Sequence, residues 1–581
     1  MVQVMWGPQL SALAEQQRTR VYVEPARRGA IEDRNGHQLA YTMQARALTV
    51  SPIILRRELA QRYEMYPDFY ADVDQTLADM ATGIPEMLKG NGSANTIPSS
   101  EDILAKLQAD TSYEVLAPAV DPDLAAQIAE KYFGVAADRL DTRQYPNGAV
   151  AENIIGKVSS DGEGQFGFEL SSDALLAGID GKRTEDVSTN GQVIPGTARN
   201  QIPAIDGSTI QLTIDLDLQT YLQQQLEQAK KNSGAKAAEA VVLDAKSGQV
   251  LAMANADTIN PNGDIAAQLR AGRSFDNTTI STPFEPGSVA KIITAAAAIE
   301  YGLTTPDEVL TVPGSISMAG VTVRDAWVHG DIPYTTTGIF GKSSNVGTLM
   351  LAQRVGDQRF YDMARKFGIG TSTGIELPNE SSGVLPDITQ WSGGTFANLP
   401  IGQGMSMTLL QMTSMYQAIA NDGVRVQPRI IKQITRADGT VEPLGEPEKT
   451  TVVSAQTAAT VRDMFRAVTQ SDPMGYQNGT GPTAAIEGYQ ITGKTGTAQQ
   501  VDPNTGAYSN SEYWITFAGI APADNPRFVI GIMLDRPERG VHGEGGQSAA
   551  PLFHDIAAWL LNRDNVPLSA PANRLTLDAR Q

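Results

Sequence analysis

A serine and a lysine in this sequence have a spacing that suits nucleophilic catalysis. Ser288 and Lys291 lie three residues apart, within the run Glu285–Lys291. Residues three apart share one face of a helix, so the hydroxyl and the amine would lie side by side. Burial favours the neutral form of a lysine, and a neutral amine can act as a base towards a hydroxyl. The pair therefore predicts a serine nucleophile with a lysine base.

The elements around this pair should place Ser288 in the first turn of a helix. Pro286 and Gly287 are typical last residues before a helix, and the alanine-rich run to Glu300 predicts a helix that Gly302 ends. Backbone N–H groups at the beginning of such a helix would face an oxyanion formed at the serine. The expected helix thus provides both the orientation and part of an oxyanion hole.

Two further short motifs follow Ser288 along the chain. The first is Ser343-Ser344-Asn345, and the second, Lys494–Thr497 with the sequence Lys-Thr-Gly-Thr, lies in an expected strand. Single motifs are weak signals, because copies of the same spacings occur at Ser233–Lys236, Ser93–Asn95, Ser188–Asn190 and Lys246–Gly248. Each copy lies in an expected loop, turn or helix end, where Ser, Asn and Gly serve the backbone. Only one set keeps the order Ser-x-x-Lys, Ser-x-Asn, Lys-Thr-Gly in suitable context.

The composition excludes several classes of function. The chain has 581 residues, 41% of them hydrophobic, which allows two to four domains of roughly 150 residues each. A net charge of −20 argues against a nucleic-acid partner, because nothing offsets phosphate repulsion. With no cysteine there are no disulfides and no thiolate sites. The four histidines are scattered, so a histidine triad or a metal site is poorly supported, and we expect neither a metal nor another cofactor.

The sequence also predicts how the chain is organised. No apolar run reaches the roughly 18 residues that span a bilayer, so residues 1–23 are expected to be the stub of a removed membrane anchor or a disordered terminus. Asn35-Gly36 predicts a hairpin turn, and a domain boundary is expected near residue 205. Expected helices in the N-terminal part lie at 7–22, 54–64, 71–81, 100–108 and 122–131, with a loop at 90–95.

The C-terminal part combines strands at both ends with helices between them. Expected strands lie at 208–214, 240–244, 250–253, 489–499, 513–521 and 528–534. Expected helices lie at 216–231, 289–300, 346–367, 405–420 and 549–561, the last closing the chain. This order implies an α+β domain whose sheet joins distant parts of the sequence.

The ordered motif set resembles that of penicillin-binding proteins and class A β-lactamases. Over nearly its whole length the chain is similar to a class B penicillin-binding protein, closest to the division-specific peptidoglycan D,D-transpeptidase of actinobacteria. The stretches that support the resemblance are Arg28–Gly36, Gly164–Glu169, Leu176–Gly178, Phe340–Thr348, Ile401–Gly404 and residues 492–499. It implies an α+β fold: a serine transpeptidase domain at residues 205–581, with an antiparallel sheet flanked by helices, on an elongated α+β pedestal (dimerisation-type) domain at residues 24–204.

The resemblance also implies a role for each motif residue. Ser288 would attack the penultimate D-alanine of a peptidoglycan stem peptide, and Lys291 would take the serine proton. Ser343 would relay a proton to the leaving nitrogen, near Lys494. Substrate-binding residues would be Asn345 for the amide, Thr495 and Thr497 for the carboxylate, and Gly496 for close approach of the strand. A β-lactam antibiotic would acylate the same serine.

Other interpretations remain open at this point. Glu376-Leu377-Pro378-Asn379 faintly suggests the deacylating loop of a β-lactamase, but the proline interrupts the pattern. An elongation-type transpeptidase, or a penicillin sensor or scaffold without turnover, are further alternatives. The resemblance implies a location on the extracytoplasmic face of the cell membrane with a single N-terminal anchor. Its implied partners are a polytopic glycosyltransferase and other divisome membrane proteins.

Overall fold

The computed structural model describes residues 19–89, 97–187, 194, 196–540 and 542–580. The stub and helix expected before residue 19, the loop at 90–95 and both Ser-x-Asn copies lie outside these residues. The chain forms two compact units. The first comprises Met1–Ala30, Ala40–Pro146 and Ala177–Gly207. The second comprises Ile31–Leu39, Asn147–Leu176 and Ser208–Gln581.

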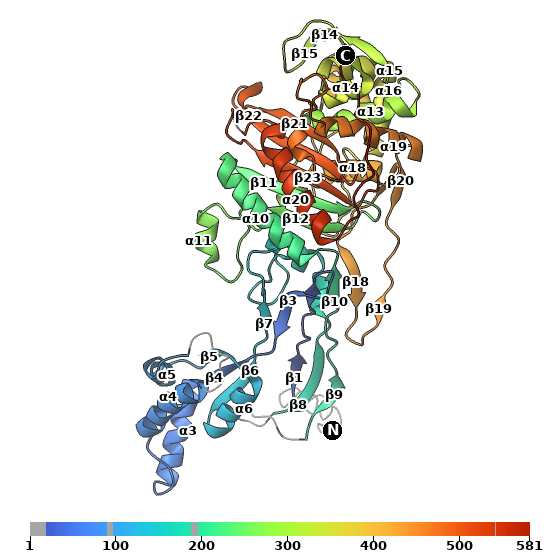
Figure 1. The fold of residues 1–581 in the computed structure, drawn as a ribbon. Helices are drawn as coiled ribbons and strands as arrows, with labels where there is room; N and C mark the ends of the chain where they lie inside the picture. The colour runs from blue at the N-terminus through green and yellow to red at the C-terminus, as the bar shows by residue number, and fades with distance from the viewer. Residues whose placement is uncertain (1–18, 90–96, 188–193, 195, 541, 581) are drawn as a thin grey trace. The chain divides into compact units, whose positions relative to one another are not determined.

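The first unit contains two small antiparallel sheets, in blue to cyan-green in Figure 1. One sheet has the order β5-β4-β6, with β4 (Arg46–Val50), β5 (Glu114–Val120) and β6 (Val135–Arg139). Its core packs against α3 (Pro52–Met65), α4 (Val73–Lys89), α5 (Ser100–Gln108) and α6 (Pro122–Lys131). The other sheet has the order β1-β8-β9, with β1 (Thr19–Glu24), β8 (Gly181–Asp186) and β9 (Arg199–Ile202). In this unit β3 (Gln38–Met43) also pairs with β7 (Thr142–Gln144) over residues 41–43. The four helices expected between residues 54 and 131 are confirmed.

The second unit is built on a five-stranded antiparallel sheet with the order β12-β11-β23-β22-β21. Its strands are β11 (Ala237–Asp244), β12 (Val250–Asn255), β21 (Thr492–Val501), β22 (Tyr508–Ala521) and β23 (Phe528–Asp535). Strand β11 pairs with β23 over its whole length, although almost 300 residues of chain separate them. This confirms the prediction of a sheet that joins distant segments.

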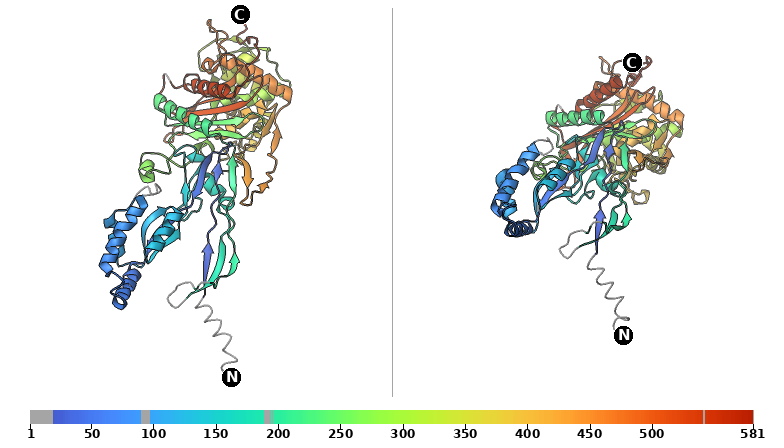
Figure 2. Two further views of the ribbon diagram at one scale, coloured as in Figure 1. Left: turned by 60° about the horizontal axis from the view of Figure 1, so that its bottom comes forward. Right: turned by 90° about the horizontal axis from the view of Figure 1, so that it is seen from below.

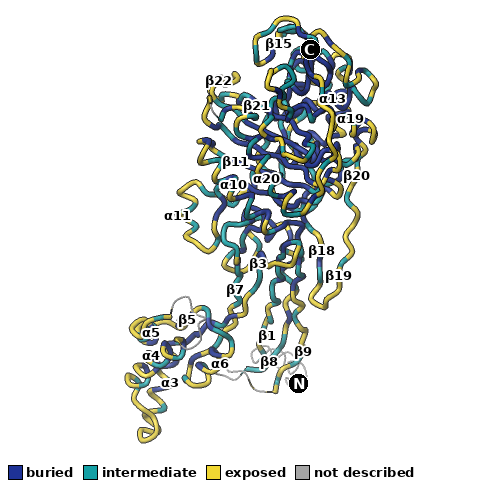
Figure 3. Tube along the Cα trace, in the orientation of Figure 1, coloured by how far each residue is buried: buried dark blue, intermediate teal, exposed yellow. Residues whose placement is uncertain are grey.

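Helices cover both faces of this sheet. Helices α10 (Leu216–Ser233) and α20 (Ala550–Arg563) share one hydrophobic core with Ala238, Ala240 and Val242, which lie on one face of β11. Figures 1 and 2 show these two helices running along the same side of the sheet. Helix α18 (Leu409–Ala420) packs on the other face, where Thr413 lies directly over Gly531 of β23. The sheet is therefore buried on both sides, as the dark tube in Figure 3 shows.

Further helices lie next to the sheet. They are η1 (Gly287–Ala290), α13 (Lys291–Glu300), α14 (Thr336–Gly341), α15 (Asn345–Val355), α16 (Asp357–Lys366) and α19 (Ala455–Met464). Two of them carry the predicted catalytic residues Ser288 (η1) and Lys291 (α13). Eight of the ten residues of α13 are buried, which fits its alanine-rich sequence. Smaller strands complete the unit: β2 (Ile31–Glu32), β10 (Thr209–Leu212), β13 (Val309–Val312), β14 (Ser315–Met318), β15 (Val321–Arg324), β16 (Ile332–Thr335), β17 (Val424–Val426), β18 (Ile431–Thr435), β19 (Val441–Glu442) and β20 (Lys449–Thr451). Short helical segments are α7 (Glu152–Ile155), α8 (Gly167–Ser171), α9 (Asp173–Ala177), α11 (Ile265–Arg270), α12 (Thr278–Ser281), η2 (Ile388–Gln390), α17 (Thr395–Asn398), η3 (Leu399–Ile401), η4 (Phe465–Thr469), η5 (Pro482–Ala484) and η6 (Gly545–Ala549).

Several expectations about secondary structure are wrong. Residues 19–22, expected in a helix, belong to β1, where they pair with β8. The helix expected over 346–367 is two helices, because Gly356 with a φ of 83° interrupts the helical backbone. The chain does not end in α20: residues beyond it continue without a helix, and Leu577 O accepts a hydrogen bond from Thr335 N. Across the described residues, no helix combines the length and the apolar composition that crossing a bilayer requires.

Candidate active site

Ser288 lies on a short 3-10 turn that leads into α13. The expected first α-helical turn is thus 3-10 instead, and Gly287 adopts a φ of 62° just before the serine. The turn is held from two sides: Gly287 N donates to Gly402 O at 3.1 Å, and the Tyr416 hydroxyl donates to Val289 O at 2.8 Å. Ser288 is half-buried, whereas its neighbours in the turn are buried. A fixed backbone therefore presents the serine hydroxyl at the rim of the core.

The amine of Lys291 is buried and faces the second motif. Its Nζ donates to Ser343 O at 2.8 Å and to Ser343 Oγ at 3.1 Å. Burial lowers the pKa of Lys291 to about 7, and the negative charge of Asp325 opposes this shift. The neutral amine is therefore accessible near neutral pH, as a base requires.

The Ser-x-Asn motif forms the connection between α14 and α15. Ser343 has a φ of 57°, an uncommon backbone conformation for a residue with a side chain. Ser344 caps α15, since its Oγ accepts a hydrogen bond from Gly347 N at 2.9 Å. Asn345 begins the helix, and its Nδ2 donates to Arg324 O at 3.0 Å. The strained Ser343 is thus fixed between two helices with its hydroxyl at Lys291.

The third motif lies on β21, the strand at one edge of the sheet. Side chains alternate along a strand, so Lys494 and Gly496 share one face and Thr495 and Thr497 the other. Gly496 faces the Ser288 turn: a Cβ there would lie 2.8 Å from Val289 Cγ2 and 3.0 Å from Pro286 O. The glycine is therefore needed for the strand to pack against the turn. This structural reason adds to the one expected from the sequence, which is close approach of the strand to a ligand.

The free edge of β21 provides backbone groups to the site. Lys494 Nζ donates to Thr495 O at 3.0 Å, so this carbonyl points away from the ladder with β22. Because an antiparallel strand alternates between paired and free positions, Thr497 N–H also points to the free edge. The hydroxyls are held as well: Thr495 Oγ1 lies 2.6 Å from Thr480 Oγ1, and Thr497 Oγ1 accepts from Gly545 N at 3.3 Å.

The two buried lysines influence each other. Burial, and secondly the charge of Lys291, lower the pKa of Lys494 well below its usual range. The two amines therefore lie within electrostatic range of each other. Together with the Lys291–Ser343 hydrogen bonds and the packing of Gly496, this proximity shows that all three motifs meet around one site.

Two residues that support the site were not expected from the sequence. Asp325 accepts hydrogen bonds from Ser344 Oγ at 2.8 Å and from Val346 N at 2.9 Å. Thr480 orients the hydroxyl of Thr495. No motif includes either residue. The sequence feature that could have indicated Asp325 is His329, a histidine four residues further along the chain.

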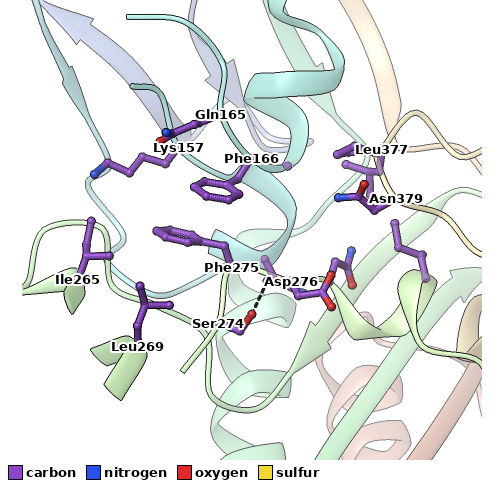
Figure 4. A pocket seen from close by; sticks show the side chains of 15 residues that line it. Lys157, Gln165, Phe166, Ile265, Leu269, Ser274, Phe275, Asp276, Leu377 and Asn379 are labelled. Atoms are coloured by element: carbon purple, nitrogen blue, oxygen red, sulfur yellow. Dashed lines mark hydrogen bonds between the residues drawn. The ribbon is translucent and has the colours of Figure 1, made fainter. Parts of the chain in front are cut away.

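The segment that suggested a β-lactamase loop has another role. The carboxylate of Glu376 accepts a hydrogen bond from Ile430 N at 3.0 Å, in the connection before β18. Leu377, Pro378 and Asn379 line a cavity of about 390 Å³ whose wall includes the stacked rings of Phe166 and Phe275 (Figure 4). None of the residues lining this cavity belongs to the three motifs. Nor does any group of three or more His, Asp or Glu in the described part of the chain have the geometry of a metal site.

Comparison with known families identifies the fold and the motif set. Residues 238–558 match the penicillin binding protein transpeptidase domain, and residues 23–212 match the penicillin-binding protein dimerisation domain. The chain belongs to the class B penicillin-binding proteins. Penicillin-binding protein PbpB of Mycolicibacterium smegmatis is 56% identical over all of this chain and 89% of its own length. PbpB of Mycobacterium tuberculosis is 57% identical over all of this chain and 84% of its own length.

More distant members and solved structures agree. Peptidoglycan D,D-transpeptidase FtsI of Escherichia coli is 31% identical over 93% of this chain and 84% of its own. The crystal structure of penicillin-binding protein 3 from Mycobacterium tuberculosis with ampicillin is similar with a TM-score of 0.75 and 50% identity. That match covers 96% of this chain and 100% of the crystallised one. The expected family and two-domain α+β fold are therefore confirmed.

Proposed function

We propose that this penicillin-binding protein is a peptidoglycan D,D-transpeptidase that cross-links stem peptides through an acyl-enzyme on Ser288. The main support is the buried amine of Lys291, hydrogen-bonded to Ser343 at the beginning of the helix that follows the serine. Relatives named as peptidoglycan D,D-transpeptidases support the reaction class. The resemblance to division-specific members supports a septal role, and an elongation role is the alternative.

In the acylation step, Ser288 Oγ attacks the carbonyl carbon of the penultimate D-alanine, and its proton passes to the neutral amine of Lys291. The resulting oxyanion accepts hydrogen bonds from the backbone N–H groups of Ser288 and Thr497. Ser343, hydrogen-bonded to Lys291, passes a proton to the nitrogen of the terminal D-alanine as the C–N bond breaks. The products are free D-alanine and an ester on Ser288.

In the second step, an amine of a neighbouring stem peptide attacks this ester. The C–O bond breaks, Ser288 regains its proton and a new amide joins the two peptides. During acylation, Asn345 orients the amide of the donor stem peptide, and Thr495, Thr497 and Lys494 bind the carboxylate of its terminal D-alanine before that residue leaves. Gly496 keeps β21 against the Ser288 turn so that these groups converge.

Intact-mass measurement after penicillin treatment tests the acyl-enzyme. We expect one penicillin per chain on the peptide that contains Ser288, and none in Ser288→Ala; an adduct retained in that variant would refute the assignment. A slowly hydrolysed adduct separates this function from that of a β-lactamase. Cross-linking of stem peptides in vitro separates it from a sensor or scaffold without turnover.

We further infer where the protein works. Its substrate lies outside the cytoplasm, which supports a location on the extracytoplasmic face of the cell membrane with a single N-terminal anchor. Residues 24–204 would form the pedestal and residues 205–581 the catalytic domain. A polytopic glycosyltransferase and other divisome membrane proteins are the proposed partners, and cross-linking in cells followed by mass spectrometry tests them.

A further inference from the structure

Asp325 and His329 form a buried pair behind the Ser-x-Asn motif. His329 Nε2 lies 2.8 Å from Asp325 Oδ2, and the two side chains are 5% and 0% exposed. The other ring nitrogen, Nδ1, lies 2.6 Å from Gly330 O. Trp327 stacks on the imidazole at 5.2 Å between ring centroids. Both ring nitrogens therefore face an acceptor, and the ring is almost fully buried.

The hydrogen-bond partners determine where the protons are. A backbone carbonyl only accepts, so Nδ1 of His329 must carry a proton. Ser344 Oγ accepts from Gly347 N, so its own proton goes to Asp325 Oδ2 at 2.8 Å. A further proton must lie between Nε2 and Oδ2, because one of these two atoms has to donate. His329 and Asp325 therefore share this proton, and together they have zero net charge.

This pair acts on two groups of the proposed acylation site. Through Ser344 and Val346, the carboxylate of Asp325 holds the turn in which Ser343 adopts its uncommon backbone. The same carboxylate lies within electrostatic range of Lys291 and opposes the lowering of its pKa. An unpaired carboxylate there would favour the protonated amine, which cannot act as a base.

We propose that Asp325 and His329 are positioning residues for acylation: as a neutral pair they fix the Ser343–Asn345 turn without leaving a free negative charge beside Lys291. The inference rests on the proposed function of Ser288 and Lys291. Besides His329 and Lys291, the titratable groups around Asp325 include Tyr334 of β16, whose pKa is raised to about 12 by burial and then by the negative charges of Asp578 and Asp325. Tyr334 stays neutral near pH 7, and Lys494 is a further buried titratable group that interacts with Lys291.

The pH dependence of acylation tests this role, because a merely structural contact would not shift it. The rate constant for labelling by a fluorescent penicillin is measured between pH 5 and 9 for wild type, His329→Gln and Asp325→Asn. Glutamine can still donate to Asp325 but carries no charge, so the midpoint of the pH profile should rise by about one unit. At pH 7 the neutral fraction of Lys291 would then fall from about one half to about one tenth, and labelling would be roughly fivefold slower.

The two substitutions should have opposite effects. Asp325→Asn removes the negative charge, so the midpoint should fall below that of wild type, while the loosened turn lowers the maximum rate. Asp331→Asn is the matched control, an exposed carboxylate near the same loop, and should leave the profile unchanged.

An unchanged midpoint in folded His329→Gln, or a shift in the same direction in both variants, would overturn the inference. If Asp325→Asn fails to fold, the His329→Gln midpoint alone decides. Wild-type protein that is not labelled at Ser288 would instead refute the proposed function.

Discussion

Replacing Gly496 by alanine should disable acylation while leaving the fold intact. A Cβ at this position would lie 2.1 Å from Thr516 Oγ1, 2.8 Å from Val289 Cγ2 and 3.0 Å from Pro286 O. The threonine side chain can rotate away, but Pro286 O belongs to the backbone of the Ser288 turn. Non-bonded carbon atoms pack at about 3.5–4.0 Å, so strand and turn would have to separate by about 1 Å.

That displacement separates Ser288 from Lys494 and from the N–H of Thr497. A misplacement of about 1 Å costs on the order of 100-fold in rate, so labelling by a fluorescent penicillin should slow by about this factor. The overpacking should lower stability by only about 1–3 kcal/mol, because the ladder with β22 remains. Gly445→Ala is the matched control, since a Cβ there meets no atom within 4 Å. A folded Gly496→Ala variant that is labelled at the wild-type rate would refute this reasoning.

Two further predictions follow from buried titratable groups. The labelling rate of wild type should rise with pH through about 7, where Lys291 loses its proton. Lys291→Arg should stay folded but unlabelled, since a guanidinium remains protonated. A rate already maximal at pH 5, or a labelled arginine variant, would contradict this. Burial raises the pKa of Glu239 to about 8, so the folded state binds this proton more tightly than the unfolded chain, and stability should fall as the pH rises from about 4.5 to 8. Glu239→Gln should remove this loss and raise the free energy of unfolding at pH 7 by on the order of 3 kcal/mol, measured by chemical denaturation; equal stability of both proteins at pH 8 would contradict it.

Apart from the sheet that joins distant segments, the parts of the fold that could be predicted are those that local sequence determines. The alanine-rich run to Glu300 is a helix, Lys246–Gly248 is the turn of the β11–β12 hairpin, and Ser233 ends α10 at Gly234, which has a φ of 68°. The turn at Asn35-Gly36 is also confirmed, with Gly36 at a φ of 87°. In each case a helix propensity or a glycine determines the backbone within a few residues, and tertiary contacts do not change that local structure.

The details that could not be predicted depend on distant contacts. The 3-10 geometry at Ser288 accompanies contacts from Gly402 and Tyr416, more than 100 residues away along the chain. Asp325 lies outside every motif, and only the folded chain brings its carboxylate to Ser344. The order of the three motifs along the chain was enough to predict that they meet. Each motif alone is a weak signal, but the ordered set is specific. The residues that position them have no comparable pattern.

In the proposed mechanism, the two buried lysines would couple substrate binding to activation of the nucleophile. Lys291 and Lys494 are both 0% exposed, and the charge of Lys291 lowers the pKa of Lys494. Two ammonium groups within electrostatic range in a buried site repel each other, so an empty site disfavours holding both protons. A substrate carboxylate beside Lys494 would favour its ammonium form. That ammonium would in turn favour the neutral amine of Lys291, so the bound carboxylate prepares the base that Ser288 needs.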